Sequence, residues 1–109
     1  MSGSDSGGAP GASPGGWPAS PCEDLRLDRN LEAPVLGVAD GLAAGDQLEV
    51  VLREGQPPLV VALDPAGREA GGILPTGQLI ECLRRGFRFQ ADVTGRTGGA
   101  VQLVVRAAA

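Results

Sequence analysis

The 109-residue sequence contains no histidine, lysine or tyrosine, and it has only two cysteines and three aromatic side chains. Without histidine there is no imidazole to act as a general base or as a metal ligand. Without lysine there is no amine for a Schiff base and no P-loop lysine, and two cysteines are too few for a four-cysteine zinc site. We therefore expect a protein that is not an enzyme and that needs neither a metal nor a cofactor.

Positive charge and long hydrophobic runs are also scarce. The 9 basic residues, all arginine, face 13 acidic ones, which gives a net charge of −4 and no overall basic field to attract nucleic acid. Arginine without lysine is typical of a GC-rich genome, so we expect a bacterial source. The sequence has no run of about 18 apolar residues, and we therefore expect no transmembrane helix and no membrane partner.

The two cysteines bear on the compartment. The start of the chain lacks a basic stretch followed by an apolar one, so a secretory signal is not expected. This favours the reducing cytoplasm, where Cys22 and Cys82 would be free thiols. A disulfide between them is the alternative that we favour less. Cys82 is also the one candidate nucleophile, but without a histidine to lower its pKa we interpret it as a buried structural thiol.

Residues 1–21 consist largely of glycine, serine and proline, which supply 15 of the 21 positions. Such a segment has almost nothing to bury and cannot offset the entropy lost on ordering. We predict a disordered tail over 1–21 and a single domain over 22–109. Trp17 in this tail is either the anchor of a short linear motif or a solvated side chain, and we favour the second interpretation.

Apolar and polar residues alternate along most of the rest of the chain. A period of two places successive side chains on opposite faces of a strand, so one face of each segment is expected to be buried. Residues 22–32 are either a lead-in strand or an irregular segment. Gly71-Gly72 indicates a bulge or a tight bend, and Asp64-Pro65-Ala66-Gly67 a type I turn. Strands are predicted within 33–41 and at 47–53, 59–63, 68–74, 87–94 and 100–106.

Only the segment 76–85 has helical spacing. Thr76 is a suitable N-cap, Leu79 and Cys82 share one face, and Gly86 is the expected stop. The helix is too short to be stable alone and must pack on the sheet. The order of strands, one helix and a final hairpin predicts a mainly β fold. We expect a small antiparallel β-barrel or a strongly bent sheet of about six strands with one short helix.

The final hairpin brings cations together in its predicted pairing. If the last two strands are joined by a turn at 95–99 with their apolar faces matched, Arg88 lies opposite Arg106 on the outer face. Arg84 and Arg85 end the helix that leads into this hairpin. The four guanidinium groups either bind an anion, such as a phosphate, a nucleic-acid end or an acidic protein surface, or form a solvated face neutralised by carboxylates. We favour the solvated face.

Short motifs are spread over about 60 residues in the middle of the chain. They are Gly37-Val38, Leu52-Arg53-Glu54 at a strand end, Gly67, Gly72, Leu74-Pro75 and a leucine-bearing helix at 79–83. With these motifs the segment from Val35 to Val93 resembles a HIRAN domain. The resemblance implies a small oligonucleotide-binding-like barrel and recognition of single-stranded or 3′-ended DNA beside helicase or nuclease modules. Of the family's ligand contacts it carries over only Arg53.

Taken together, these features predict a small non-catalytic binding or scaffold module that meets a protein partner as a monomer or weak dimer. Such a role requires an exposed apolar groove or a free edge strand. The alternative function is HIRAN-like binding of single-stranded or 3′-end nucleic acid through the arginine cluster, which we define as Arg53, Arg84, Arg85, Arg88 and Arg106.

Overall fold

The computed structural model of the chain describes residues 20–108. The predicted tail, and Trp17 with it, lies outside these residues apart from Ser20 and Pro21, which begin the first helix. In chain order the elements are α1 (Ser20–Glu23), β1 (Arg26–Asn30), α2 (Leu36–Ala39), β2 (Gln47–Arg53), β3 (Leu59–Leu63), β4 (Glu69–Ile73), α3 (Gly77–Arg84), β5 (Phe89–Thr97) and β6 (Ala100–Ala107).

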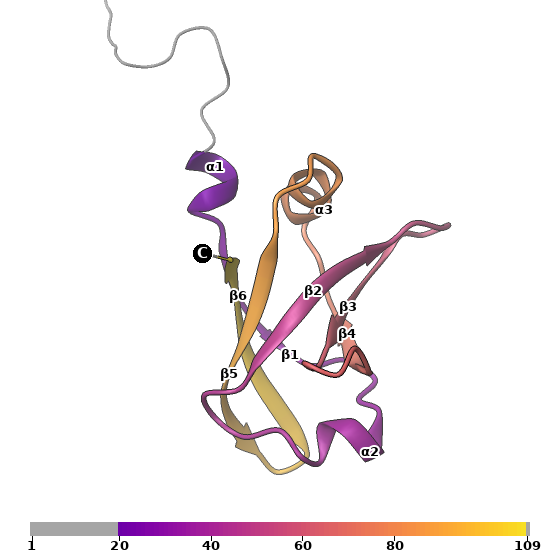
Figure 1. Cartoon of the computed structure of the whole chain (residues 1–109), viewed down its shortest axis with the longest axis vertical. Helices are drawn as coiled ribbons and strands as arrows, with labels where there is room; N and C mark the ends of the chain where they lie inside the picture. The colour runs from indigo at the N-terminus through magenta and orange to yellow at the C-terminus, as the bar shows by residue number, and fades with distance from the viewer. Residues whose placement is uncertain (1–19, 109) are drawn as a thin grey trace, which may run out of the picture.

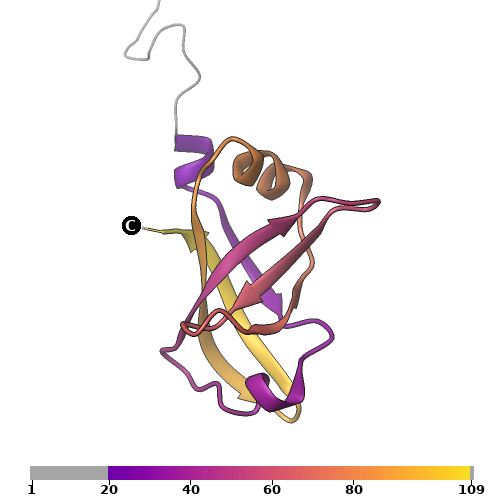
Figure 2. The same cartoon turned by 45° about the vertical axis from the view of Figure 1, so that its right-hand side comes forward.

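The strands form one antiparallel sheet in the order β1-β6-β5-β2-β3-β4. The sheet curls into a half-barrel, with α1 and α3 at one end and α2 at the other (Figures 1 and 2). This confirms the predicted fold class. It also resolves the segment 22–32, which contributes a strand that pairs with the last strand of the sheet.

The inner face of the sheet forms the hydrophobic core, because alternate residues of each strand point to it. Leu48 and Val50 of β2 and Phe89 and Val93 of β5 are each at most 5% exposed. Leu79 of α3 is completely buried and covers the open end of the half-barrel. The short helix is therefore held by the sheet, as its length requires.

The two edges of the half-barrel meet at one point. Glu32 and Gly72 exchange two backbone hydrogen bonds of 2.7 and 2.8 Å, which connect the chain after β1 to β4. Nearby, the Arg29 Nε donates to the Leu74 carbonyl at 2.7 Å. A Cβ on Gly71 would lie 2.7 Å from the Glu32 carbonyl oxygen and 2.7 Å from the Leu31 Cγ. Glycine is required at Gly71 because the two segments approach so closely. The predicted bulge lies beside it, at Ala70.

The local signals for α3 and for the turn after β3 are confirmed. The Thr76 Oγ1 accepts a hydrogen bond from the Leu79 N–H at 3.1 Å, which is the N-cap contact. Gly86 follows the helix with a φ of 93°, where a side chain would be strained. Gly67 closes the β3–β4 turn, donating its N–H to the Asp64 carbonyl at 2.8 Å.

The predicted strand within 33–41 is wrong, because this segment holds the single-turn helix α2. The Ala39 N–H donates to the Val35 carbonyl at 2.7 Å, while the Val35 N–H donates to the Ala70 carbonyl at the edge of β4. The turn satisfies its own backbone groups and buries Ala39 and Leu42. This segment connects the edge of the sheet at β4 to the start of β2, and the helical turn pairs its backbone groups along the way.

The prediction that the cysteines are free thiols is also wrong. Cys22 of α1 and Cys82 of α3 form a disulfide, with their Cα atoms 5.7 Å apart and each residue 2% exposed. The pairing of β1 with β6 carries α1 to the end of the half-barrel that α3 covers, and so it brings together two residues 60 positions apart.

The pairing predicted for the last hairpin differs from the structure by two residues. The turn contains only Gly98 and Gly99, β5 continues to Thr97, and a bulge lies at the register shift between Val93 and Gly95. Arg106 therefore lies opposite Gln90, and not opposite Arg88 as predicted.

Candidate binding surfaces

Arg106 of the arginine cluster is paired with a carboxylate. Its Nε donates to the Asp92 Oδ2 on the neighbouring strand at 2.5 Å, and Gln90 donates to the other carboxylate oxygen at 2.7 Å. Partial burial raises the pKa of Asp92, but the hydrogen bonds from Arg106 and Gln90 outweigh it and hold the pKa below its ordinary value. On the other side, Arg106 is opposite Arg26 of β1. The sequence did not indicate that Arg26 lies opposite Arg106.

Arg84 connects α3 to the β2–β3 hairpin. Its Nε and one terminal nitrogen each donate to Glu54 at 2.9 Å, which is the two-pronged geometry that suits guanidinium and carboxylate. The hydrogen bond from Arg84 lowers the pKa of Glu54, and the same bond raises the pKa of Arg84. Because both side chains are largely exposed, this pair is expected to contribute little to the stability of the fold.

Arg53 is the residue carried over from the HIRAN resemblance. It lies on β2 and forms an ion pair with Glu69 of β4, on the other side of β3. Its guanidinium lies 2.6 Å from the Glu69 carboxylate. Arg53 pairs with Leu59 and Glu69 with Leu63, so the two side chains reach over the outer face of β3 above Val61. Val61 is only 4% exposed although it lies outside the main core. Arg53 therefore covers an apolar residue and is engaged by a carboxylate.

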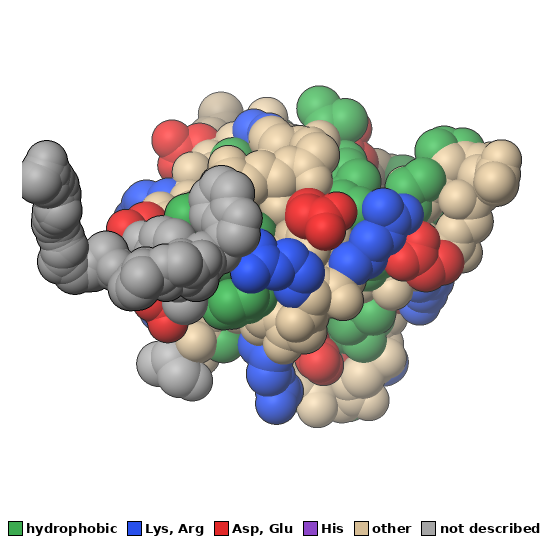
Figure 3. Space-filling model, turned by 90° about the horizontal axis from the view of Figure 1, so that it is seen from above, with side chains coloured by type: hydrophobic (Ala, Val, Ile, Leu, Met, Phe, Trp, Pro, Cys, Tyr) green, Lys and Arg blue, Asp and Glu red, His purple; other side chains and the backbone are tan. Residues whose placement is uncertain are grey.

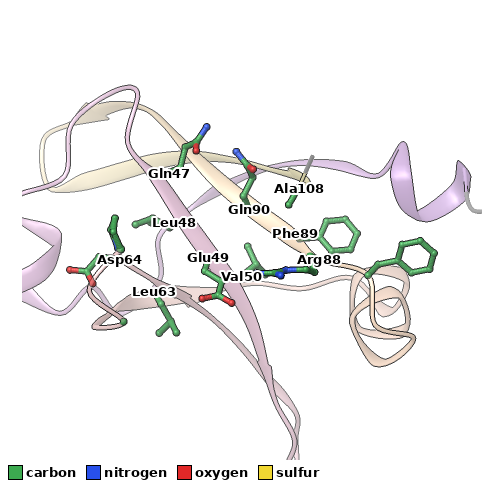
Figure 4. A pocket seen from close by; sticks show the side chains of 13 residues that line it. Gln47, Leu48, Glu49, Val50, Leu63, Asp64, Arg88, Phe89, Gln90 and Ala108 are labelled. Atoms are coloured by element: carbon green, nitrogen blue, oxygen red, sulfur yellow. The ribbon is translucent and has the colours of Figure 1, made fainter.

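Arg85 and Arg88 occupy two different places. The Arg85 guanidinium lies 5.6 Å from the centre of the Phe87 ring, a cation–π contact. Arg88 lines a depression of about 370 Å³ over β2 and β5, where it extends across β2 toward Val50, with Glu49 beside it (Figure 4). Its backbone carbonyl accepts from the Ala108 N–H at 2.9 Å. Arg85 and Arg88 therefore do not line the same site.

The structure does not gather the arginine cluster into one basic surface. Three of its members, Arg53, Arg84 and Arg106, are ion-paired with carboxylates. Seen from the end that carries α1 and α3, basic and acidic side chains are interspersed (Figure 3). The register behind the predicted cluster was wrong, and its cations are distributed over several elements. Their binding role stays a prediction.

Asp64 is the one buried charged residue among the described residues, with 8% of its surface exposed. Its carboxylate accepts from the backbone N–H of Arg68 at 2.8 Å and of Ala66 at 3.0 Å, and from the Arg68 guanidinium at 2.8 Å. The backbone hydrogen bond from Arg68 is the main cause that lowers the pKa of Asp64. This carboxylate stabilises the β3–β4 turn.

Within residues 20–108, no three cysteine, aspartate or glutamate side chains lie close enough together to hold a metal ion. Over the same residues no helix combines the length and the apolar character needed to cross a membrane. Cys82, the candidate nucleophile, is bonded to Cys22.

An apolar groove lies on the outer side of β3 and β4. It encloses about 410 Å³, and we call it the β3–β4 groove. Leu59 and Leu74 line it and are 57% and 62% exposed, which is unusual for leucine side chains that lie so close together. Gly72, opposite Val61 in the sheet, also lines the groove and contributes no side chain to it. The other lining residues are Glu32, Ala33, Pro58, Val60, Val61, Glu69, Ile73 and Pro75.

Two features of the sequence produce this groove. Leu59 and Val61 belong to a strand that is apolar on both faces, and the alternation that buries Val60 and Ala62 places them on the outside. Leu74 is the residue between β4 and Pro75, where the chain leaves the sheet for α3. A strand that is apolar on both faces is typical of the interior of a sheet, and β3 lies between β2 and β4. What the sequence did not show is that its outer face is only partly covered.

Comparisons with models of known protein families, with curated proteins and with solved structures find no match for this chain. A function for the protein is therefore inferred from the fold and the surfaces described above.

Proposed function

We propose that the protein is a non-catalytic binding module whose β3–β4 groove receives an apolar segment of a protein partner. The observation that carries this proposal is the pair of exposed leucines, Leu59 and Leu74, on the two sides of one groove. Burying apolar surface contributes roughly 25 cal/mol per Å², so covering two exposed leucines and the adjoining prolines would favour the binding of an apolar segment.

The charges around the groove define the partner's chemistry. Glu32 and Glu69 line it, and the net charge of the whole chain is −4. Arg53 already engages the Glu69 carboxylate, whereas Glu32 is exposed at the edge of the groove. An apolar segment with an arginine or lysine beside it is therefore complementary, because its cation would lie near Glu32. An acidic segment would be disfavoured.

Panning a random peptide library against the folded protein tests this function. We expect the enriched peptides to share an apolar anchor beside a basic residue, and to bind the double variant Leu59→Ser/Leu74→Ser at least several-fold more weakly. Leu36→Ser is the matched control, because Leu36 is 70% exposed but does not line the groove. Peptides that bind the double variant equally well would overturn the proposal, and so would a library that yields no enriched peptide.

Two other occupants give different results in parallel measurements. Sedimentation would detect a dimer that dissociates in the double variant, which would assign the groove to a second copy of the chain. A labelled single-stranded oligonucleotide, titrated at two salt concentrations, tests the HIRAN-like alternative. Salt-dependent binding that is lost in Arg85→Ala/Arg88→Ala, without peptide binding, would replace our proposal by that alternative.

The disulfide bears on the compartment in which the protein works. The sequence predicted a cytoplasmic protein with two free cysteines. The Cys22–Cys82 disulfide favours an oxidising compartment instead, because disulfides persist mainly there. Peptide binding should therefore be measured on the oxidised protein, and a thiol count after denaturation checks its state.

A further inference from the structure

Gly71 and Gly72 are neighbours in β4, but the packing of the fold explains only the first of them. A Cβ on Gly71 would lie 2.7 Å from atoms of the neighbouring segment, whereas the nearest atoms to a Cβ on Gly72 would be at 3.7 Å, an ordinary contact distance. The φ of Gly72 is not positive, and the residue pairs in register with Val61, away from the bulge at Ala70. Neither close packing nor backbone conformation therefore requires glycine at position 72.

Glycine is an unfavourable residue at such a position in a strand. It loses more conformational freedom on folding than any other residue and brings no side chain to pack on the sheet. Where glycine occurs inside a strand without a bulge, it often marks a place where another molecule or another chain comes close to the backbone. Gly72 is half-buried and lines the β3–β4 groove, so the backbone is approached there from outside the fold.

The space over Gly72 has walls on several sides. Glu69 and Leu74 flank it along the chain, Val61 is its partner on β3, and Glu32 is its partner on the other side. All four of these residues line the β3–β4 groove. The base of the groove at this point is the flat backbone of Gly72. A flat base between side-chain walls fits a planar group better than a branched one.

Aromatic rings are the planar groups that cover glycine in β-sheets, especially on edge strands such as β4. Within residues 20–108 the only aromatic side chains are Phe87, which contacts Arg85, and Phe89, which is buried in the core. The described part of the chain thus supplies no ring to Gly72. A closed cavity of about 150 Å³ holds a benzene molecule. The β3–β4 groove, with about 410 Å³, has room for a ring and for part of a neighbouring side chain.

We propose that an aromatic side chain of the partner lies flat on the backbone of Gly72, beside Leu74, and anchors the segment that the β3–β4 groove receives. This inference rests on the proposed function and adds the class of residue that the groove selects. The basic residue next to the anchor then lies near Glu32, which is hydrogen-bonded to Gly72. Gly72 is accordingly a residue that determines specificity.

Two phage-displayed peptide libraries that differ in one fixed residue test the anchor. Both carry an arginine next to the fixed position, which is phenylalanine in one library and leucine in the other, and both are random elsewhere. We expect the phenylalanine library to yield peptides that bind at least ten-fold more tightly. Gly72→Ala should weaken these peptides several-fold, because the added methyl group lifts the ring from the backbone, and should change the binding of leucine peptides less than two-fold.

Gly37→Ala is the matched control. A Cβ on Gly37 also has open space around it, and the residue lies outside the β3–β4 groove, so both kinds of peptide should bind this variant as they bind the wild-type protein. Gly72→Ala should keep the circular dichroism spectrum and the urea midpoint of the wild-type protein. A Gly72→Ala variant that fails to fold would overturn the proposal, because the fold itself would then require the glycine.

The binding results separate this inference from the proposed function. Leucine peptides that bind as tightly as phenylalanine peptides would overturn the aromatic anchor, and so would phenylalanine peptides that bind Gly72→Ala unchanged. In both cases the proposed function stands if binding is lost in Leu59→Ser/Leu74→Ser. If neither library yields a peptide that is sensitive to this double variant, the proposed function and the aromatic anchor are both wrong.

Discussion

The disulfide between α1 and α3 makes a large, calculable contribution to stability. We predict that Cys22→Ala/Cys82→Ala lowers the free energy of unfolding by about 4 kcal/mol, the value that the chain-entropy relation gives for residues 60 positions apart. A chain of this length is stable by only roughly 5 to 15 kcal/mol, so the loss is a large share of the total. The double variant should fold, but its free energy of unfolding should be small.

Urea denaturation measures this loss. With a slope of about 1.5 kcal/mol per M, the midpoint should fall by roughly 3 M. The wild-type protein in the presence of a reductant is the control, because it keeps both sulfur atoms in the core and loses only the bond. A double variant less than about 1 kcal/mol weaker than the oxidised protein would refute the reasoning. So would a reduced wild-type protein as stable as the oxidised one.

Three further changes test the closure of the sheet, the β3–β4 turn and the helix cap. Gly71→Ala should cost about 2 to 4 kcal/mol in thermal or urea unfolding, because its methyl group would displace the Glu32 carbonyl and strain two backbone hydrogen bonds; a neutral result would contradict the close approach. Asp64→Asn should lower stability at neutral pH. The folded state lowers the pKa of Asp64, so its stabilisation is present above the ordinary value of about 4 and is lost as the pH falls through the folded value. The curves of stability against pH for the wild-type protein and for the Asp64→Asn variant should therefore converge in acid, and parallel curves would exclude this role. Thr76→Ala should cost about 1 kcal/mol by loss of the N-cap, measured by chemical denaturation, with Thr76→Ser expected to restore it.

Much of the fold was predictable from short-range patterns. The alternation at 47–53 and 59–63 matches β2 and β3 residue for residue, and Thr76 and Gly86 were recognised as the ends of the helix region. These signals depend on a few neighbouring residues, so the sequence states them directly. The segment 33–41 was misread because a few apolar residues fit a short strand and a single helical turn equally well. The conformation of this segment depends on its hydrogen bond to the distant strand β4.

Long-range features could not be read in the same way. The bulge between Val93 and Gly95 displaces the hairpin register, and alternation carries no signal for it. The disulfide depends on the pairing of β1 with β6, which no local pattern reveals. The arginine cluster failed as one surface for the same reason. Arg53 and Arg84 find their carboxylates 16 and 30 positions away, across strands whose arrangement was not known.

The pairing of β1 with β6 also has a consequence for protein engineering. Arg26 lies opposite Arg106, and α1 and the last described residues lie at the same end of the half-barrel (Figure 1). A domain with neighbouring ends can be inserted into a surface loop of a host protein without forcing that loop apart. Joining these ends and opening the chain at the Gly98-Gly99 turn would give a circular permutant that keeps every strand neighbour except the tight hairpin connection.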